Sequence, residues 1–134
     1  MKKEIHNQPT CPFCHPGKSR VLTANAHAIA IYDGSPVTLG HTLIIPKRHV
    51  SSFFETSREE QAALLDLLAE MRQRLLEERN PAGFNIGNND GTAAGQTVMH
   101  LHIHLIPRYS GDTEDPRGGV RWIMPEKAPY WKKP

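Results

Sequence analysis

Short apolar stretches along the chain predict a set of β-strands. They cover residues 20–24, 26–33, 42–46 and 83–88, and Asn25 separates the first two. The stretch at 42–46 reads Thr-Leu-Ile-Ile-Pro and is typical of a buried strand. Gly and Pro residues at 34–36 break the chain between two of the strands.

One long segment has the periodicity of an amphipathic helix. Ser57 and Glu60 have the spacing of a capping box at its start, and Asn80-Pro81 should end it. Its apolar positions fall on one stripe and should face the core: Leu64, Leu68, Met71 and Leu75. One helix among several strands with short connections predicts an α+β fold with an antiparallel sheet of about five strands.

A strict alternation of histidine and apolar residues occupies positions 100–104, His-Leu-His-Ile-His. In a strand beginning at His100, Leu101, Ile103 and Leu105 would enter the core, and the three histidines would share the other face. Pro107 should end this strand or place it at a sheet edge. Three imidazoles on one wall indicate a metal site or a nucleophile with supporting groups. The alternative is a polar surface strand, which would place three of the eight histidines together by chance.

The loop Gly95-Gln96-Thr97 lies directly before these histidines. Gly95 allows close approach of the backbone to a ligand, and Gln96 and Thr97 offer neutral donors suited to phosphate oxygens. An ordinary turn is the alternative, and the neighbouring histidines favour the binding loop.

Composition narrows the class of protein. The 134 residues are 38% hydrophobic and 22% charged with a net charge of +2, which fits one folded domain over 1–134 and does not favour nucleic-acid binding. No apolar run is long enough to cross a membrane, and residues 1–6 do not resemble a secretory signal, so we expect a cytoplasmic protein. From about residue 110 the chain is rich in Pro and Gly and should be irregular. Its apolar side chains should pack over a site or a partner subunit: Trp122, Ile123, Tyr130 and Trp131.

The two cysteines, Cys11 and Cys14, have the spacing of a zinc knuckle. A redox pair is the alternative, but that chemistry favours the start of a helix after a strand, and this segment is Pro-rich with no strand before it.

Two motifs together resemble the histidine triad (HIT) family of nucleotide hydrolases and transferases. The first runs from Gly95 to Ile106 and matches the signature His, apolar, His, apolar, His, apolar, apolar at every position. The second comprises Tyr32-Asp33 followed by residues 40–49, and the similarity extends from about Cys11 to Tyr109. The resemblance implies a HIT-like fold, a homodimer, and attack on the α-phosphate of a nucleotide through a nucleotidyl-histidine intermediate.

The resemblance also implies roles for individual residues. His102 would be the nucleophile, and its second ring nitrogen should bond to a backbone carbonyl. His104, Gln96 and Thr97 would assist catalysis by contacting phosphate or leaving-group oxygens. The remaining nucleotide contacts would be Asp33 on the ribose, Asn89 on phosphate, Gly95 in the loop, and His41 as a pocket residue or a structural histidine.

Zinc would bind to Cys11, Cys14, His49 and His100 by the same resemblance, with His15 as a competing ligand. Four protein ligands close a tetrahedral site, so this zinc would be structural. The substrate suggested is a dinucleoside polyphosphate such as diadenosine tetraphosphate. A purine nucleoside phosphoramidase and a non-catalytic nucleotide-binding protein are the alternatives.

Overall fold

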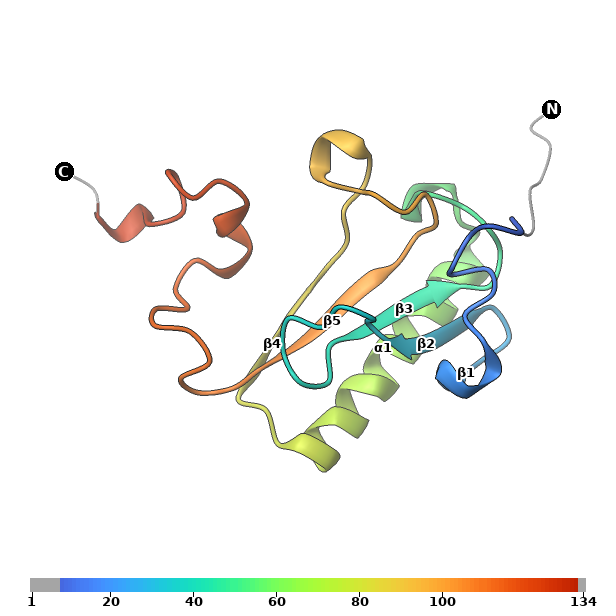
Figure 1. Ribbon diagram of the computed structural model, residues 1–134, viewed down its shortest axis with the longest axis horizontal. Helices are drawn as coiled ribbons and strands as arrows, with labels where there is room; N and C mark the ends of the chain where they lie inside the picture. Colours follow the sequence, from blue (N-terminus) through green and yellow to red (C-terminus); the bar gives the residue numbers. More distant parts are fainter. Residues whose placement is uncertain (1–7, 133–134) are drawn as a thin grey trace.

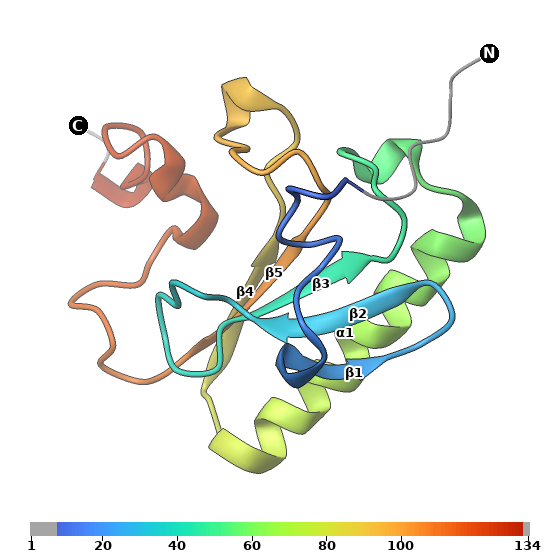
Figure 2. The ribbon, with the colours of Figure 1, turned by 45° about the vertical axis from the view of Figure 1, so that its right-hand side comes forward.

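The computed structural model describes residues 8–132, so the expectation about residues 1–6 falls outside the described part. Five strands form one antiparallel sheet in the order β1-β2-β3-β5-β4 (Figure 1). They are β1 (Val21–Ala24), β2 (Ala28–Tyr32), β3 (Thr42–Pro46), β4 (Gly83–Gly87) and β5 (Ile103–Arg108). The single α-helix of the described residues, α1 (Arg58–Arg79), lies across one face of this sheet (Figure 2). The predicted α+β architecture is confirmed.

Local signals in the sequence place the ends of α1. The Ser57 hydroxyl accepts the Glu60 amide at 3.0 Å, and the Glu60 carboxylate accepts the Ser57 amide at 2.9 Å, which completes the capping box. Asn80 ends the helix in the left-handed conformation, with φ of 47°. Arg48 also binds the buried Glu60 carboxylate at 2.8 Å, so the start of α1 is tied to the segment after β3.

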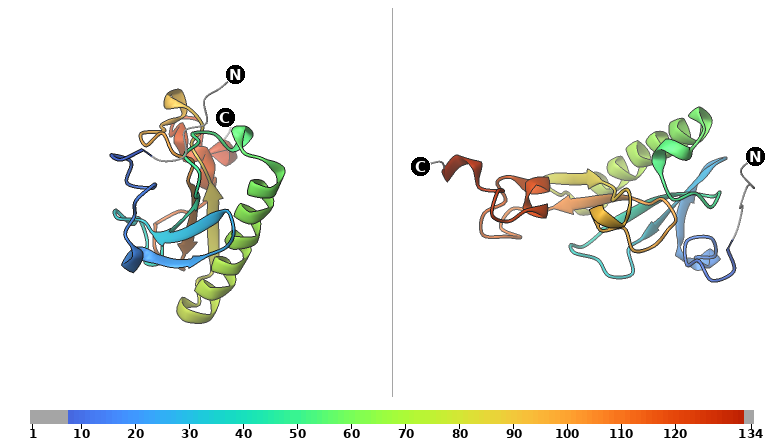
Figure 3. Two further views of the ribbon diagram at one scale, coloured as in Figure 1. Left: turned by 90° about the vertical axis from the view of Figure 1, so that its right-hand side faces the viewer. Right: turned by 90° about the horizontal axis from the view of Figure 1, so that it is seen from above.

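The sheet has a different apolar cluster on each face. On the α1 face, the helix stripe packs against residues of β2, β3 and β5, and Leu101, Ile103 and Leu105 enter this core as expected. On the outer face, Ile31, Leu43 and Ile45 form a second cluster, and Phe13 of the N-terminal segment packs against it. The left panel of Figure 3 shows α1 and the N-terminal segment on opposite sides of the sheet. Because β3 is covered on both faces, all five of its residues are buried.

The histidine run differs from its predicted strand at the start. β5 begins at Ile103, and His100 and His102 precede it. The Leu101 amide donates to the Val50 carbonyl at 2.6 Å in the loop after β3, so this part of the chain bonds to a loop and not to the sheet. Because the chain leaves the sheet here, His100 does not lie on an exposed strand face and is fully buried.

Pro107 also lies elsewhere than predicted, because it is inside β5, between β3 and β4. The pairing of β5 with β3 ends at Leu105, and the Pro107 carbonyl accepts the Thr38 hydroxyl at 2.6 Å on that side. The nitrogen of a strand residue points to the same side as its carbonyl. The Pro107 nitrogen therefore points to the β3 side of β5, beyond the last residue paired with β3. The missing N–H of the proline leaves no β3 carbonyl without its donor there.

The C-terminal tail, residues 110–132, lies at the opposite end of the long axis from the N-terminal segment (Figure 3, right panel). It contains two short 3-10 turns, Gly119–Ile123 and Tyr130–Lys132. Trp131 packs within the tail, whereas Ile123 is 79% exposed in this single chain, so its packing over a site or a partner subunit stays a prediction. No helix in residues 8–132 has the length and apolar character needed to cross a membrane.

Candidate active site and metal centre

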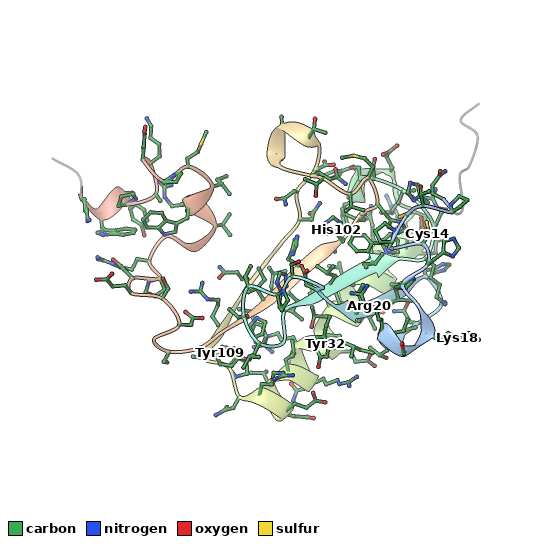
Figure 4. The ribbon with its side chains drawn as sticks, in the orientation of Figure 1. Cys14, Lys18, Arg20, Tyr32, His102 and Tyr109 are labelled. Atoms are coloured by element: carbon green, nitrogen blue, oxygen red, sulfur yellow. The ribbon has the colours of Figure 1, made fainter. Side chains whose placement is uncertain are left out.

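His104 lies on the outer face of the sheet, opposite Leu43 of β3. A cavity of about 450 Å³ opens beside it, and this cavity includes six predicted site residues: Asp33, Asn89, Gly95, Thr97, His102 and His104. Figure 4 shows His102 and Cys14 toward the same end of the sheet, with Tyr109 at the other end of β5. A larger cavity of about 980 Å³ lies on the other side of Phe13 but contains none of these six residues.

The His102 ring is held in one tautomer. Its Nδ1 lies 2.7 Å from the His100 carbonyl oxygen, which can only accept, so Nδ1 carries the proton. The other nitrogen, Nε2, then keeps its lone pair. This is the bond to a backbone carbonyl that is expected of a nucleophilic histidine. The ring also packs against Phe13, with ring centroids 4.9 Å apart.

A second chain of hydrogen bonds sets the tautomers of His41 and His104. The Val37 amide donates to His41 Nδ1 at 3.1 Å, so a neutral His41 carries its proton on Nε2. His41 Nε2 lies 2.9 Å from His104 Nδ1 and donates to it, which leaves Nε2–H of His104 as the donor available to a ligand oxygen. Burial lowers the pKa of both rings, although the Asp33 carboxylate opposes this effect, so both are neutral near pH 7.

The same hydrogen bonds argue against a metal ion among Asp33, His41 and His104. Their ligand atoms lie close together, with 3.4 Å between Asp33 Oδ2 and His41 Nε2. A metal ligand must offer a lone pair, however, and Nε2 of His41 is protonated because Nδ1 accepts the Val37 amide. This group is therefore better described as a hydrogen-bonded pair of rings, His41 and His104, with the Asp33 carboxylate beside it.

Gln96 does not line this cavity, although its neighbours Gly95 and Thr97 do. Its side chain is buried, its oxygen accepts the Gly91 amide, and its nitrogen donates to the carbonyls of Ser51 and Val98. Both amide hydrogens are used, so the expectation that this side chain contacts phosphate oxygens does not fit this structure. Gln96 holds the loop in shape, while Thr97 is exposed at the cavity.

Four further predicted residues converge at a second centre: Cys11, Cys14, His49 and His100. Cys14 Sγ lies 3.2 Å from His49 Nδ1 and 3.5 Å from His100 Nδ1, and the two Nδ1 atoms are 3.2 Å apart. A tetrahedral zinc ion would separate sulfur and nitrogen ligands by about 3.6 Å, and two nitrogen ligands by about 3.3 Å. His15 is exposed and is not part of the cluster.

His100 has the protonation state that a metal requires. Its Nε2 donates to the Pro46 carbonyl at 2.8 Å, so Nδ1, the atom that faces the cysteines, keeps its lone pair. Burial lowers the pKa of His100 to about 4, and burial raises the pKa of the Cys14 thiol. A thiolate at Cys14 therefore needs a nearby cation. The donor set and its spacing fit zinc with no open coordination position.

Phe13 and Arg20 are among the cavity residues that were not identified from the sequence. Phe13 forms a wall of the cavity, and Arg20 lies at its rim, where its guanidinium donates to the Tyr32 carbonyl at 2.9 Å. The only signal for Phe13 was its place between the two cysteines, and a lone arginine before a strand gives no signal of a pocket.

Known proteins resemble this chain in sequence and in fold. Residues 17–111 match the HIT domain. The chain belongs to the HIT family. The matched segment contains His41, His49 and all three triad histidines, but it begins after the cysteine pair and ends before most of the tail.

Among curated relatives, the HIT protein of Bacillus subtilis is 36% identical over 78% of this chain and 75% of its own length. The adenosine 5'-monophosphoramidase of Schizosaccharomyces pombe is 32% identical over 88% of this chain and 90% of its own length. Among solved structures, a zinc-bound histidine triad family protein from Mycobacterium smegmatis is 33% identical, with a TM-score of 0.71 over 79% of this chain and 80% of that one. The chain is therefore similar to nucleotide-processing proteins.

Proposed function

We propose that this HIT protein is a nucleotide hydrolase or nucleotidyl transferase that uses His102 as its nucleophile. The observation that carries the proposal is the hydrogen bond from His102 Nδ1 to the His100 carbonyl, because it leaves Nε2 unprotonated at the cavity. A neutral imidazole is a competent nucleophile near pH 7.

In the first step, the lone pair of His102 Nε2 forms a bond to the α-phosphorus. The bond from that phosphorus to the leaving oxygen or nitrogen breaks, and the leaving group takes the electron pair and then a proton. In the second step, water displaces the histidine, and a nucleoside monophosphate is released. His104 Nε2–H and Thr97, which both line the cavity, are proposed to donate to phosphate oxygens during both steps.

Asp33 is proposed to bind the ribose, since its carboxylate can accept from two neighbouring hydroxyls. One of its oxygens accepts the Ser35 amide at 2.8 Å, and the other faces His41. Asn89 is proposed to contact the phosphate chain, and Gly95, with φ of 98°, allows the loop backbone to approach it.

Zinc is proposed as a structural ion held by Cys11, Cys14, His49 and His100. Such an ion would supply a cross-link and no Lewis acid, because all four positions are taken by protein. His100 would then have two tasks, since its ring faces the metal centre and its carbonyl orients His102. Two free cysteines in this arrangement also suit the reducing cytoplasm proposed for the protein.

Dinucleoside polyphosphates such as diadenosine tetraphosphate are the proposed substrates, and the protein is proposed to act as a homodimer. A nucleoside phosphoramidase is the second candidate, favoured by the similarity to the monophosphoramidase of S. pombe. The chemistry at His102 is the same for both.

The test is to trap the intermediate. Protein mixed with a nucleotide labelled at the α-phosphate should acquire a label that resists alkali and is lost in acid, as expected of a phosphorus–nitrogen bond. His102→Ala should acquire none and should lose at least ~10³ in kcat. His27→Ala is the matched control, since His27 is an exposed histidine outside the cavity. Near-normal turnover by His102→Ala would overturn the mechanism.

A further inference from the structure

A second cavity adjoins the first one at two residues. It has a volume of about 530 Å³, and it shares Asn89 and His104 with the cavity that contains Asp33 and His102. Both shared residues are those proposed to face the phosphate chain. A ligand whose phosphates lie at Asn89 and His104 could therefore extend into both cavities.

This second cavity, called the Trp122 cavity here, lies between strands β4 and β5 and the C-terminal tail. The sheet side contributes Ile86 and Ile106, and the tail contributes Val120, Trp122 and Ile123. Its polar lining consists of neutral groups, namely Asn85, Asn88, Asn89, His41 and His104. A neutral, apolar lining suits an uncharged ring, and its volume is within the roughly 300–1,000 Å³ usual for small-molecule sites.

The tail fixes the Trp122 ring in place before any ligand binds. The indole Nε1–H donates to the Arg117 carbonyl at 2.8 Å, and a Cβ at Gly118 would lie 3.4 Å from that nitrogen. The Arg117 guanidinium in turn lies 4.4 Å from the centre of the Trp131 ring. Trp122 is nevertheless 43% exposed, so part of a pre-positioned indole remains open for stacking.

The tail also meets the sheet at the mouth of this cavity. A Cβ at Gly119 would lie 3.1 Å from the side-chain nitrogen of Asn85 on β4, so the tail backbone passes close to that side chain. Trp122 lies beyond residue 111, where the HIT domain match ends. The domain match therefore assigns no role to this part of the site.

We propose that the Trp122 cavity binds the base of the departing nucleotide, with that base stacked on Trp122. The inference rests on the proposed function, since it assumes that the α-phosphate lies at His102. The nucleoside to be transferred would occupy the cavity with Asp33 and Phe13, the phosphates would pass Asn89 and His104, and the second base would lie under the tail.

The experiment compares a leaving group that has a base with one that has none. Diadenosine tetraphosphate releases a nucleotide, whereas adenosine phosphoramidate releases ammonia. For Trp122→Ala, the ratio of kcat/KM for the dinucleotide to kcat/KM for the phosphoramidate should fall about tenfold or more, as expected from the loss of one stacked base. Trp122→Phe should restore most of the ratio. Tyr130→Ala should leave it unchanged, because Tyr130 is an exposed tail aromatic outside the cavity.

A binding measurement separates this inference from the catalytic proposal. In the His102→Ala background, Trp122→Ala should weaken diadenosine tetraphosphate about tenfold and should change AMP affinity little. Equal losses for both ligands, or no loss for either, would overturn the second-base site. Those results would leave the catalytic proposal standing if the labelled His102 adduct still forms. If no labelled His102 adduct forms but Trp122→Ala still weakens only the dinucleotide, the catalytic proposal would be overturned and the second-base site would be supported.

Discussion

Removal of one zinc ligand should destabilise this protein far more than a surface substitution does. Cys11→Ser replaces a buried thiol that lies 3.4 Å from His100 Nδ1. The metal centre would join residues that are distant in sequence, since Cys14 and His100 are 86 positions apart. By the chain-entropy argument used for cross-links, closing a loop of this length is worth about 4–5 kcal/mol as an upper value. At roughly 3–5 °C per kcal/mol for a chain of this size, this upper value corresponds to a fall in melting temperature of about 12–25 °C.

The assay is thermal unfolding followed by circular dichroism, together with zinc analysis of protein purified without added metal. Wild-type protein should contain about one zinc per chain, and chelation should lower its melting temperature to that of Cys11→Ser. His15→Ala is the matched control, since His15 is next to Cys14 but exposed and outside the cluster. Activity measured well below the melting temperature should fall less than stability does. A Cys11→Ser protein that keeps its zinc and melts with wild type would refute the reasoning.

Four further predictions concern single groups. Asp33→Asn should weaken ribonucleotide binding by roughly 1–2 kcal/mol and a 2′,3′-dideoxy analogue much less; titration of both ligands checks this, and equal losses would contradict the sugar role. His41→Ala should lower kcat about 2- to 10-fold and alter the pH dependence of kcat, because His104 loses the hydrogen bond that sets its tautomer. A change in KM alone would argue against this role of His41. Gln96→Ala should cost about 1–3 kcal/mol of unfolding free energy in urea, because its loop partners lose their hydrogen bonds; unchanged stability would count against its structural role. In metal-free protein, His100 has a pKa of about 4 because it is buried, below its unfolded value of about 6.5, so the unfolded state binds the proton first. Stability should be intact above about pH 6.5 and should decrease by about 3 kcal/mol as the pH falls to about 4; a flat profile in chelated protein would contradict this.

Local sequence signals determined the elements of this fold. The capping box of Ser57 and Glu60, the helix end at Asn80 and the apolar run of β3 each depend on residues close together in the chain, and the structure has each where the sequence placed it. The alternation around Leu101, Ile103 and Leu105 similarly indicated which side chains enter the core. Such signals are readable from sequence because propensity, capping and periodicity act over a few residues.

The residue types of the site were also evident from sequence, but their protonation states were not. The proton on His102 is set by the His100 carbonyl, that on His41 by the Val37 amide, and that on His100 by the Pro46 carbonyl, 54 positions away. A backbone carbonyl or amide has the same chemistry at every position, so no residue type marks which one will bond to a given ring.

Tertiary packing likewise decided the roles of Gln96, Phe13 and Trp122. Gln96 is a good phosphate donor by its chemistry, yet folding buries it and uses both of its amide hydrogens on the carbonyls of Val98 and the distant Ser51. Phe13 contacts His102 only because the N-terminal segment crosses the outer face of the sheet. Trp122 lines a cavity together with His104 only because the tail turns back toward β4. The sequence by itself determined which chemical groups this protein has and which local elements hold them. Only the tertiary structure decided which groups meet and which remain free for a ligand, because long-range contacts depend on how whole elements pack.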